Sequence, residues 1–517
     1  ADDPVAGARS TEEVIGRRGI RHFNLFNGNG ARQIAHWHNQ LQAVAADTRL
    51  AIPVTVSTDP RHSVRSTPAT GMTITALSRW PETTGIAAIG DPEWARIFGD
   101  AIRQELRAMG IRVYLGPMAD IFSDPRWSRG YGTFGEDPDL VTRMTAAFIT
   151  GLHGGSTVGI DSVAAMVKHF PGAGPQLRGR DAHDPRYREQ VYPGGQQELH
   201  LRPFDAAFAA GAGQVMTYYG MPVGTDWEEV GFAFNRPVVR DLLRGRYHFD
   251  GIVCTDWNVV DGTMLDGSPF GPNGWGMEDA TPSERMARAL QAGVDQFGGD
   301  DCVDVLTELV DSGCVPVERI DDSARRLLRE KFRMGLFENR YVDVDRAEEI
   351  VGSDEVRSRG EQAQRRSLVP LARDEHRAAG IDRPVLTSST KLYVEGVDAA
   401  GIADLVEVVS DPDAADVALV RLSAPFDPPS TPLEEWFHSG TLAFGAGEID
   451  RLRALAERLP VIVAVYLERP AILADLLPFA AVLIGEFGTS DRVLVRALLD
   501  GDELTGMLPF DIPASMA

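Results

Sequence analysis

The chain has 517 residues, which is too many for one ordinary domain and enough for two or three. Its formal net charge of −24 argues against a nucleic-acid or anionic-membrane partner and suits a neutral or cationic ligand. The three cysteines show neither zinc spacing nor a disulfide framework, so no metal and no cofactor are expected.

No run of about 18 apolar residues predicts a membrane span. The first ten residues lack the basic and apolar regions of a signal peptide. The sequence therefore predicts a soluble protein and leaves a cytoplasmic, periplasmic or secreted location open. It also leaves a homodimer open.

Short apolar runs alternate with amphipathic stretches over the first two thirds of the chain. The predicted strands are 22–26, 52–57, 112–115, 163–169, 214–218, 252–255 and 294–297. The clearest predicted helices are 91–109, 138–152 and 282–292. Strand–helix alternation is typical of a parallel sheet with helices outside it. Seven or eight such units predict an α/β fold, a (β/α)8 TIM-like barrel over residues 1–350.

A second alternation follows a charged, helical segment with little strand character, residues 353–383. We expect a linker at 351–384 and a smaller three-layer α/β sandwich at 385–517 that completes the active site. Its predicted strands are 391–396, 416–422, 460–467, 480–485 and a final strand at 506–513. Its predicted helices are 447–458 and 471–476.

Polar residues follow several of the predicted barrel strands. Asp59, Lys168, His169, Tyr219 and Asp256 all lie at or just beyond the carboxyl end of a strand. These ends meet at one mouth of a barrel, where catalytic side chains gather. The sequence therefore predicts one site built from separate strands.

Asp256 ends an apolar strand in the motif GIVCTDW, residues 251–257. A carboxylate at this position can attack an anomeric carbon and form a glycosyl ester. Trp257 offers an apolar surface to the face of a sugar. The competing interpretation is an Asp that only caps the strand–loop junction.

Two further motifs carry cationic side chains. Lys168 and His169 lie in KHFPG, residues 168–172, and can donate hydrogen bonds to sugar hydroxyls or hold a carboxylate ionised. Arg129 lies in DPRWSRGYGTFGEDP, residues 124–138. The competing interpretation is a rim and a loop held together by their own ion pairs.

KHFPG, DPRWSRGYGTFGEDP and GIVCTDW occur together on one strand–helix scaffold, and this combination resembles glycoside hydrolase family 3. The resemblance covers residues 22–345 and extends more loosely to the end. It implies a retaining, exo-acting β-glycosidase, most often a β-glucosidase, acting on a glycoside or oligosaccharide without a cofactor. The roles it implies are Asp256 as nucleophile, a sugar grip by Asp59, Arg129, Lys168 and His169, and Tyr219 and Trp257 beside them.

The resemblance places the acid/base on a sandwich loop that follows the strand at 416–422. Glu434 is our first candidate and Glu435 the second, and both are alternatively solvated loop charges. A different candidate is the pair Asp181 and His183, which resembles the dyad of the family's β-N-acetylglucosaminidases. If His183 transfers the proton, that activity is the alternative function, and otherwise Asp181 and His183 bind substrate.

An alternative of another class is a carbohydrate-binding protein that has lost catalysis. It rests on Gly132, where the family often has Glu, and on the absence of Glu directly after Ser423. The sequence does not predict the linkage or the aglycone, which we expect the loop at 264–278 to select.

Overall fold

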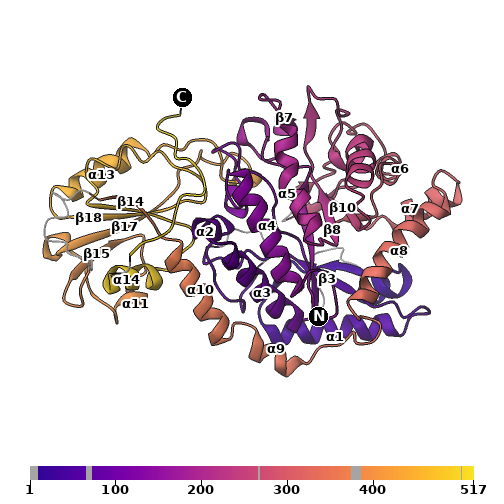
Figure 1. Cartoon of the computed structure of the whole chain (residues 1–517), viewed down its shortest axis with the longest axis horizontal. Helices are drawn as coiled ribbons and strands as arrows, with labels where there is room; N and C mark the ends of the chain where they lie inside the picture. Colours follow the sequence, from indigo (N-terminus) through magenta and orange to yellow (C-terminus); the bar gives the residue numbers. More distant parts are fainter. Residues whose placement is uncertain (1–9, 66–72, 266–267, 374–385, 502, 517) are drawn as a thin grey trace.

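Two bodies lie side by side, a larger one formed by the first two thirds of the chain and a smaller one formed by the last third (Figure 1). The computed structural model describes residues 10–65, 73–265, 268–373, 386–501 and 503–516. Within these ranges, no helix is both long and apolar enough to cross a membrane. The predicted fold class, an α/β barrel followed by a smaller α/β sandwich, is confirmed.

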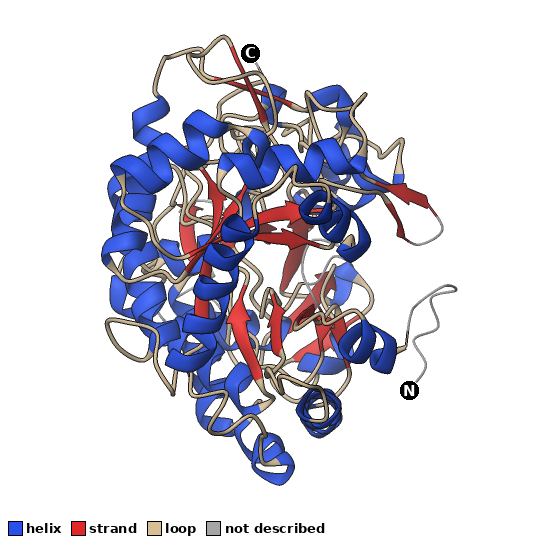
Figure 2. Ribbon diagram, turned by 90° about the vertical axis from the view of Figure 1, so that its right-hand side faces the viewer, coloured by secondary structure: helices blue, strands red, loops and turns tan. Residues whose placement is uncertain are grey.

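Seven parallel strands form one curled sheet in the larger body and follow one another in chain order. They are β1 (His22–Asn24), β3 (Thr55–Thr58), β5 (Ile111–Tyr114), β6 (Ala164–Phe170), β8 (Gln214–Thr217), β10 (Ile252–Trp257) and β13 (Gln296–Gly298). Each overlaps a predicted strand. Helices surround these strands (Figure 2). Across the described residues no ladder joins β13 to β1, so the sheet stays open there and no eighth strand closes it.

The helices of the larger body begin at clear sequence signals. Asp91 and Asp137 accept hydrogen bonds from the first backbone N–H groups of α3 and α4, and a proline follows each cap. Gly99 and Gly151 let these two helices touch, because a Cβ on either glycine would lie within 2.3 Å of a backbone oxygen of the other helix. The helices are α1 (Ala31–Ala46), α2 (Thr83–Ala88), α3 (Pro92–Ala108), α4 (Pro138–His153), α5 (Gln197–Ala209), α6 (Pro282–Ala292), α7 (Val303–Asp311), α8 (Val317–Arg333), α9 (Val344–Ile350) and α10 (Asp354–Arg366).

Small elements complete the larger body. Three two-stranded ladders are β2 (Asn27–Gly28) with β4 (Thr73–Ile74), β7 (Glu189–Val191) with β9 (Met221–Val223), and β11 (Thr263–Leu265) with β12 (Ser268–Phe270). Short 3₁₀ and π segments are Glu12–Arg17, Gly130–Gly132, Leu177–Gly179, Pro185–Tyr187, Phe232–Phe234 and Pro237–Arg246.

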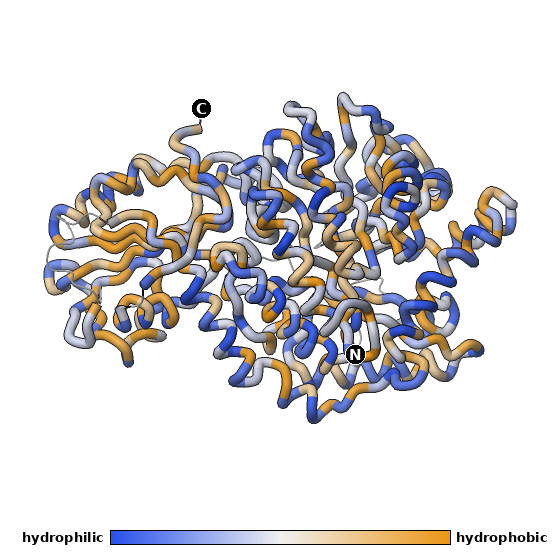
Figure 3. The backbone as a smooth tube through the Cα atoms, in the orientation of Figure 1, coloured by the Kyte–Doolittle hydropathy of each residue, from blue (hydrophilic) through white to orange (hydrophobic). Residues whose placement is uncertain are grey.

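Six strands form the sheet of the smaller body in the order β14-β19-β18-β17-β15-β16. They are β14 (Val369–Arg373), β15 (Lys391–Glu395), β16 (Glu407–Val409), β17 (Val417–Ser423), β18 (Val461–Tyr466) and β19 (Val482–Glu486). Helix α13 (Ala446–Ala456) lies on one face, and α11 (Ala399–Ile402) and α14 (Asp491–Asp500) lie on the other (Figure 1). The central strands are mostly apolar, as expected for a sheet covered on both faces (Figure 3), and the buried pair of Arg421 and Glu486 lies near their carboxyl ends. The short helix α12 (Pro432–Trp436) and the turn Pro412–Ala414 lie in loops.

Two predictions for the smaller body are wrong. Residues 471–476 form turns and a β-bridge to the chain at Ala443 instead of a helix, because the stretch between Pro470 and Pro478 is too short to nucleate one. Residues 506–513 form no strand. Their backbone bonds instead to Leu368 and to the larger body.

The charged segment at 353–383 differs from its prediction. It contains α10 and also β14, which pairs antiparallel with β19 at the edge of the second sheet. Residues 374–385, which include the end of the predicted linker, lie outside the described residues. The domain boundaries at 350 and 385 remain predictions.

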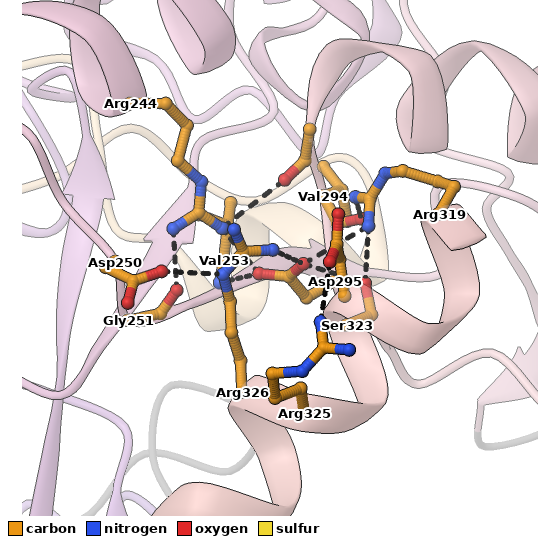
Figure 4. Close-up of polar contacts among 12 residues, drawn as sticks. Arg244, Asp250, Gly251, Val253, Val294, Asp295, Arg319, Ser323, Arg325 and Arg326 are labelled. Carbon is orange, nitrogen blue, oxygen red and sulfur yellow. Dashed lines mark hydrogen bonds and ion pairs between the residues drawn. The ribbon is translucent and has the colours of Figure 1, made fainter.

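A buried carboxylate, Asp295, joins β10 to the surrounding helices at the base of the barrel (Figure 4). It accepts hydrogen bonds from Arg244 at 2.5 Å, Arg326 at 3.0 Å, the Ser323 hydroxyl at 2.7 Å and the backbone N–H of Val253 at 3.1 Å. A buried charge with this many donors is fully compensated. The network therefore anchors the lower end of β10.

We expect Asp295→Asn to lower the free energy of unfolding by about 2–4 kcal/mol, since it leaves half-buried guanidinium groups without their counter-charge. Urea unfolding followed by tryptophan fluorescence measures the change. Asp322→Asn on α8 is the matched control, because the ion pair of Asp322 is with the exposed Arg325. Equal unfolding midpoints for the two variants would contradict the anchoring role.

Candidate active site

Side chains from four strand ends line one cavity of about 310 Å³ at the mouth of the barrel. Asp59 follows β3, Lys168 and His169 lie in β6, Tyr219 follows β8, and Asp256 lies in β10. The structure thus brings together the residues that the sequence places at separate strand ends.

Asp256 is buried, and its two carboxylate oxygens differ in their contacts. Oδ1 accepts a hydrogen bond from the backbone N–H of Trp257 at 2.9 Å. Oδ2 is buried without a hydrogen-bond partner among the described residues and lies 4.0 Å from Nε2 of His169. An unsatisfied buried carboxylate oxygen is costly, which points to a functional position.

Asp59 and Lys168 form a salt bridge of 2.7 Å in the wall of the cavity. The second oxygen of Asp59, Oδ1, is buried and has no partner within the described part of the chain. Lys168 thereby balances the charge of Asp59 and leaves one oxygen able to accept a ligand hydroxyl. The rim ion pair anticipated from the sequence exists, and it faces the cavity.

His169 is held from behind by Asp120, a residue that the sequence analysis missed. Asp120 Oδ2 lies 2.9 Å from His169 Nδ1, and Oδ1 accepts from the backbone N–H groups of His169 and Ala173. Burial raises the pKa of Asp120 to about 6, and burial, with the nearby charge of Arg129, lowers the pKa of His169 well below its usual range. His169 is therefore neutral. Asp59 directly follows β3, whereas Asp120 lies in the loop beyond β5, so the strand-end pattern does not single it out.

Arg129 and Asp181 place opposite charges beside the cavity. Burial works to raise the pKa of Asp181, but the charge and hydrogen bond of His183 and the charge of Arg129 outweigh it and bring the pKa to about 2. Burial likewise works to lower the pKa of Arg129, and the charges of Asp181 and Asp256 raise it. Both groups stay ionised near neutral pH.

His183 lines the same cavity as Asp256 and forms the predicted contact with Asp181. Its ring stacks on Phe437 of the smaller body, with centroids 5.0 Å apart and an interplanar angle of 17°. It also meets the edge of the Tyr219 ring at 4.6 Å. The imidazole of His183 thus packs between the two bodies, and the carboxylate of Asp181 orients it.

Glu434 lies outside this cavity. Its carboxylate accepts hydrogen bonds from the backbone N–H and hydroxyl of Ser430, at 2.7 and 2.6 Å, and pairs with Arg186 at 3.1 Å. These Ser430 hydrogen bonds lower the pKa of Glu434. Glu434 lines a small neighbouring cavity together with His183, whereas Glu435 is exposed.

The loop that carries the dyad is fastened to the smaller body. Arg180, directly before Asp181, donates to Asp427 Oδ2 at 2.6 Å and to the Ser439 hydroxyl at 2.8 Å. No local sequence pattern indicates these contacts, because they join residues about 250 positions apart. Arg180 therefore places Phe437 against His183.

The outer wall of the cavity is apolar. Trp257 lies there as predicted, together with the side chains of Phe26, Met264, Phe270 and Trp436. Met264 and Phe270 belong to the loop expected to select the aglycone, of which residues 266–267 lie outside the described ranges. For the part of the chain that is described, no group of three or more His, Cys, Asp or Glu side chains is placed to hold a metal ion.

The family model for the glycosyl hydrolase family 3 N-terminal domain matches residues 7–330. The chain is also 40% identical over 517 residues to beta-glucosidase C of Emericella nidulans, covering 100% of this chain and 83% of that protein. The chain belongs to glycosyl hydrolase family 3. The family resemblance inferred from the three motifs is therefore confirmed, and the chain is a glycosidase.

Other similar proteins are longer than this chain, and the solved ones share its fold. The periplasmic beta-glucosidase/beta-xylosidase of Dickeya chrysanthemi is 39% identical over 526 residues, covering 96% of this chain and 79% of its own. The solved beta-glucosidase of Listeria innocua, in complex with isofagomine, has a TM-score of 0.77 at 21% identity and covers 99% of this chain and 75% of its own. An exo-1,3/1,4-beta-glucanase from a Pseudoalteromonas species has a TM-score of 0.79 at 21% identity, covering 98% of this chain and 67% of its own. At this identity the two structures show the shared fold.

We expect Arg180→Gln to lower kcat/KM for an aryl β-glycoside about tenfold. The variant lacks the hydrogen bonds to Asp427 and Ser439 that hold Phe437 against His183. Steady-state kinetics measure the change, and Arg180→Lys should keep more of the activity since it retains the charge. Arg178→Gln is the matched control, an exposed arginine two residues away. Wild-type kinetics for Arg180→Gln would show that the fastening is irrelevant to turnover.

Proposed function

We propose that this family 3 glycosidase is a retaining, exo-acting β-glucosidase that uses Asp256 as nucleophile. The observation that carries the proposal is Oδ2 of Asp256, which lies in the wall of the cavity without a hydrogen-bond partner among the described residues. An oxygen that makes no internal hydrogen bond is available to attack the anomeric carbon. Release of terminal, non-reducing β-linked glucose is supported by two relatives, one named beta-glucosidase C at 40% identity and one named beta-glucosidase/beta-xylosidase at 39%.

The polar side of the cavity suits one terminal sugar. Asp59 can accept from sugar hydroxyls through its free oxygen, and Lys168 and Arg129 can donate. The carboxylate of Asp120 accepts from Nδ1–H of His169, which assigns the lone pair to Nε2. His169 therefore accepts from a hydroxyl and forms no ion pair with Asp256, whose charge stays available for attack.

The reaction follows two displacements. Asp256 Oδ2 bonds to C1 of the sugar while the bond from C1 to the aglycone oxygen breaks, and that oxygen takes a proton from the general acid. Water then attacks C1 and gives a proton to the same group, which acts as base, and the ester bond to Asp256 breaks. Glucose leaves with the β configuration that it had in the substrate.

The geometry favours His183 over Glu434 as the proton-transfer group. His183 lines the cavity that holds Asp256, and Asp181 orients it and stabilises its protonated form. Glu434 faces a neighbouring cavity, and its lowered pKa keeps it ionised near neutral pH, so it carries no proton to donate. Glu434 instead serves the contact between the two bodies through Arg186.

A second candidate function is β-N-acetylglucosaminidase activity. It is supported by the contact between Asp181 and His183, the pair that resembles the dyad of the family's β-N-acetylglucosaminidases. Paired assays with 4-nitrophenyl β-glucoside and 4-nitrophenyl N-acetyl-β-glucosaminide separate the two. A higher kcat/KM on the glucoside supports the first function, and the reverse order supports the second.

Asp256→Ala should lower kcat for 4-nitrophenyl β-glucoside by about four orders of magnitude, because the ester can no longer form. Trapping the native enzyme with a 2-fluoro glucosyl donor should label the peptide that contains Asp256, as read by mass spectrometry. The exposed Asp261 provides the matched control, Asp261→Asn. Undiminished hydrolysis by Asp256→Ala, or a label on another carboxylate, would overturn the assignment, and sugar binding without turnover by the native protein would make it a binding protein.

The role of His183 shows in how the loss of activity depends on the leaving group. We expect His183→Asn to lower kcat about 100-fold for phenyl β-glucoside and less than about tenfold for the 2,4-dinitrophenyl glucoside, whose departure needs little protonation. Glu434→Gln should affect both substrates alike and only weakly. If Glu434→Gln shows the dependence on leaving group instead, then Glu434 is the acid/base.

A further inference from the structure

A second cavity, of about 460 Å³, lies at the end of the barrel opposite the catalytic mouth. Several elements contribute to its lining: His38 from α1, Arg107 from α3, Arg112 from the start of β5, Met334 after α8 and Arg346 from α9. These helices lie along the lower edge of Figure 1. None of the residues of the candidate active site contributes to it.

The charges lining this lower cavity do not balance. Its acidic residues are Asp161, which pairs with Arg107 at 2.6 Å, and Asp343, which caps α9 by accepting from backbone N–H groups. Arg112, Arg340 and Arg346 also line it, and none of these three has a carboxylate partner among the described residues. An excess of cations in one cavity is unexpected on a chain with a net charge of −24.

Arg112 is the most unusual of these cations, because it is only 7% exposed. Its Nε and Nη2 donate to the backbone carbonyls of Ser162 at 3.0 Å and Ile160 at 2.9 Å, and more distantly to that of Met334. Across the described residues its Nη1 has no hydrogen-bond partner. Burial, with the nearby charge of Arg107, lowers the pKa of Arg112 to about 10, and the charges of Asp161 and Glu330 offset this only in part.

The wall that faces Arg112 is held in place by side-chain contacts. His38 Nε2 donates to the carbonyl of Arg340 at 3.0 Å, and Asn39 exchanges two hydrogen bonds with the backbone of Val342. The segment that carries Arg340 is therefore set before any ligand arrives, which reduces the entropy lost on binding.

We propose that this lower cavity binds a small tetrahedral oxyanion, through Arg112 at its base and Arg340 and Arg346 around it. Guanidinium groups bind phosphate oxygens through charge-assisted, paired hydrogen bonds. The volume exceeds that of a phosphate ion, so the oxyanion is either free phosphate or the phosphate group of a small ester. The proposal does not depend on the identity of the sugar or of the nucleophile at the other end.

The test is equilibrium dialysis of the full chain against radiolabelled inorganic phosphate, at constant ionic strength set with chloride. We expect one saturable site per chain, and a melting temperature that rises with phosphate concentration. Arg346→Gln, which changes an exposed side chain, should weaken binding about tenfold, and Arg112→Gln at least as much. Arg143→Gln on α4, also exposed, is the matched control and should bind as the native chain does. If Arg112→Gln fails to fold, Arg346→Gln decides.

Glycerol 3-phosphate, with glycerol as its control, forms the second arm. Tighter binding of the ester than of phosphate identifies a phosphorylated metabolite as the ligand class, and equal binding identifies the free ion. Absence of saturable binding of both up to about 20 mM, or equal loss of binding in Arg346→Gln and Arg143→Gln, overturns the proposal. Glycosidase activity is not the readout, so failure here leaves the proposed function intact.

Discussion

The site is organised around a carboxylate, Asp256, that is buried yet keeps one oxygen without a partner among the described residues. Three of the nearby donors are committed elsewhere. Lys168 pairs with Asp59, the Nδ1–H of His169 bonds to Asp120, and the Tyr219 hydroxyl donates to the carbonyl of Trp257 at 2.7 Å. A donor freed from its own acceptor would turn toward Asp256 and lower its nucleophilicity. These residues therefore have two effects: they leave the carboxylate of Asp256 without their hydrogen bonds, and they provide polar groups that can bind the sugar.

The smaller body completes the site through contacts that cross between the bodies. Phe437 stacks on His183, and Arg180 reaches Asp427 across the junction. On another side of the junction, Tyr466 at the end of β18 donates to Glu82 of the larger body, which also pairs with Arg61. Single partly exposed ion pairs contribute little to stability. The contacts of Arg180 matter instead for the geometry of the site, because they fix the position of Phe437 relative to the imidazole of His183.

Features that depend on neighbouring residues in the sequence could be predicted, and features that depend on contacts between distant residues could not. The barrel strands and the residues at their ends were predictable, because an apolar run followed by a polar residue is a local signal. Asp120 lacks this signal, because it lies in a loop beyond β5 and its role depends on a contact with His169, 49 positions away. The edge strand β14 was not predictable from the charged segment around it, since it forms by pairing with β19, more than 100 residues away. The position of Glu434 outside the catalytic cavity was not predictable either, because its contacts with Ser430 and with the distant Arg186 determine it.

Three buried charges in the barrel differ in how many partners they have, and this difference distinguishes a stabilising role from a functional one. Asp295 at the base receives several donors, including Arg244 and Arg326, so its charge anchors the strand β10. Asp256 at the other end of that strand has an oxygen that receives none from the described residues, and that oxygen lines the catalytic cavity. Arg112 lies at the base and also lines a cavity, and no carboxylate of the described ranges lies within salt-bridge distance of it, although the charges of Asp161 and Glu330 act on it from farther away. The buried Arg285 and Arg469 also bond only to backbone carbonyls, so burial without a salt bridge does not by itself mark a binding site. A ligand at Arg112 is favoured instead by the cavity that it shares with Arg340 and Arg346, neither of which has a carboxylate partner among the described residues.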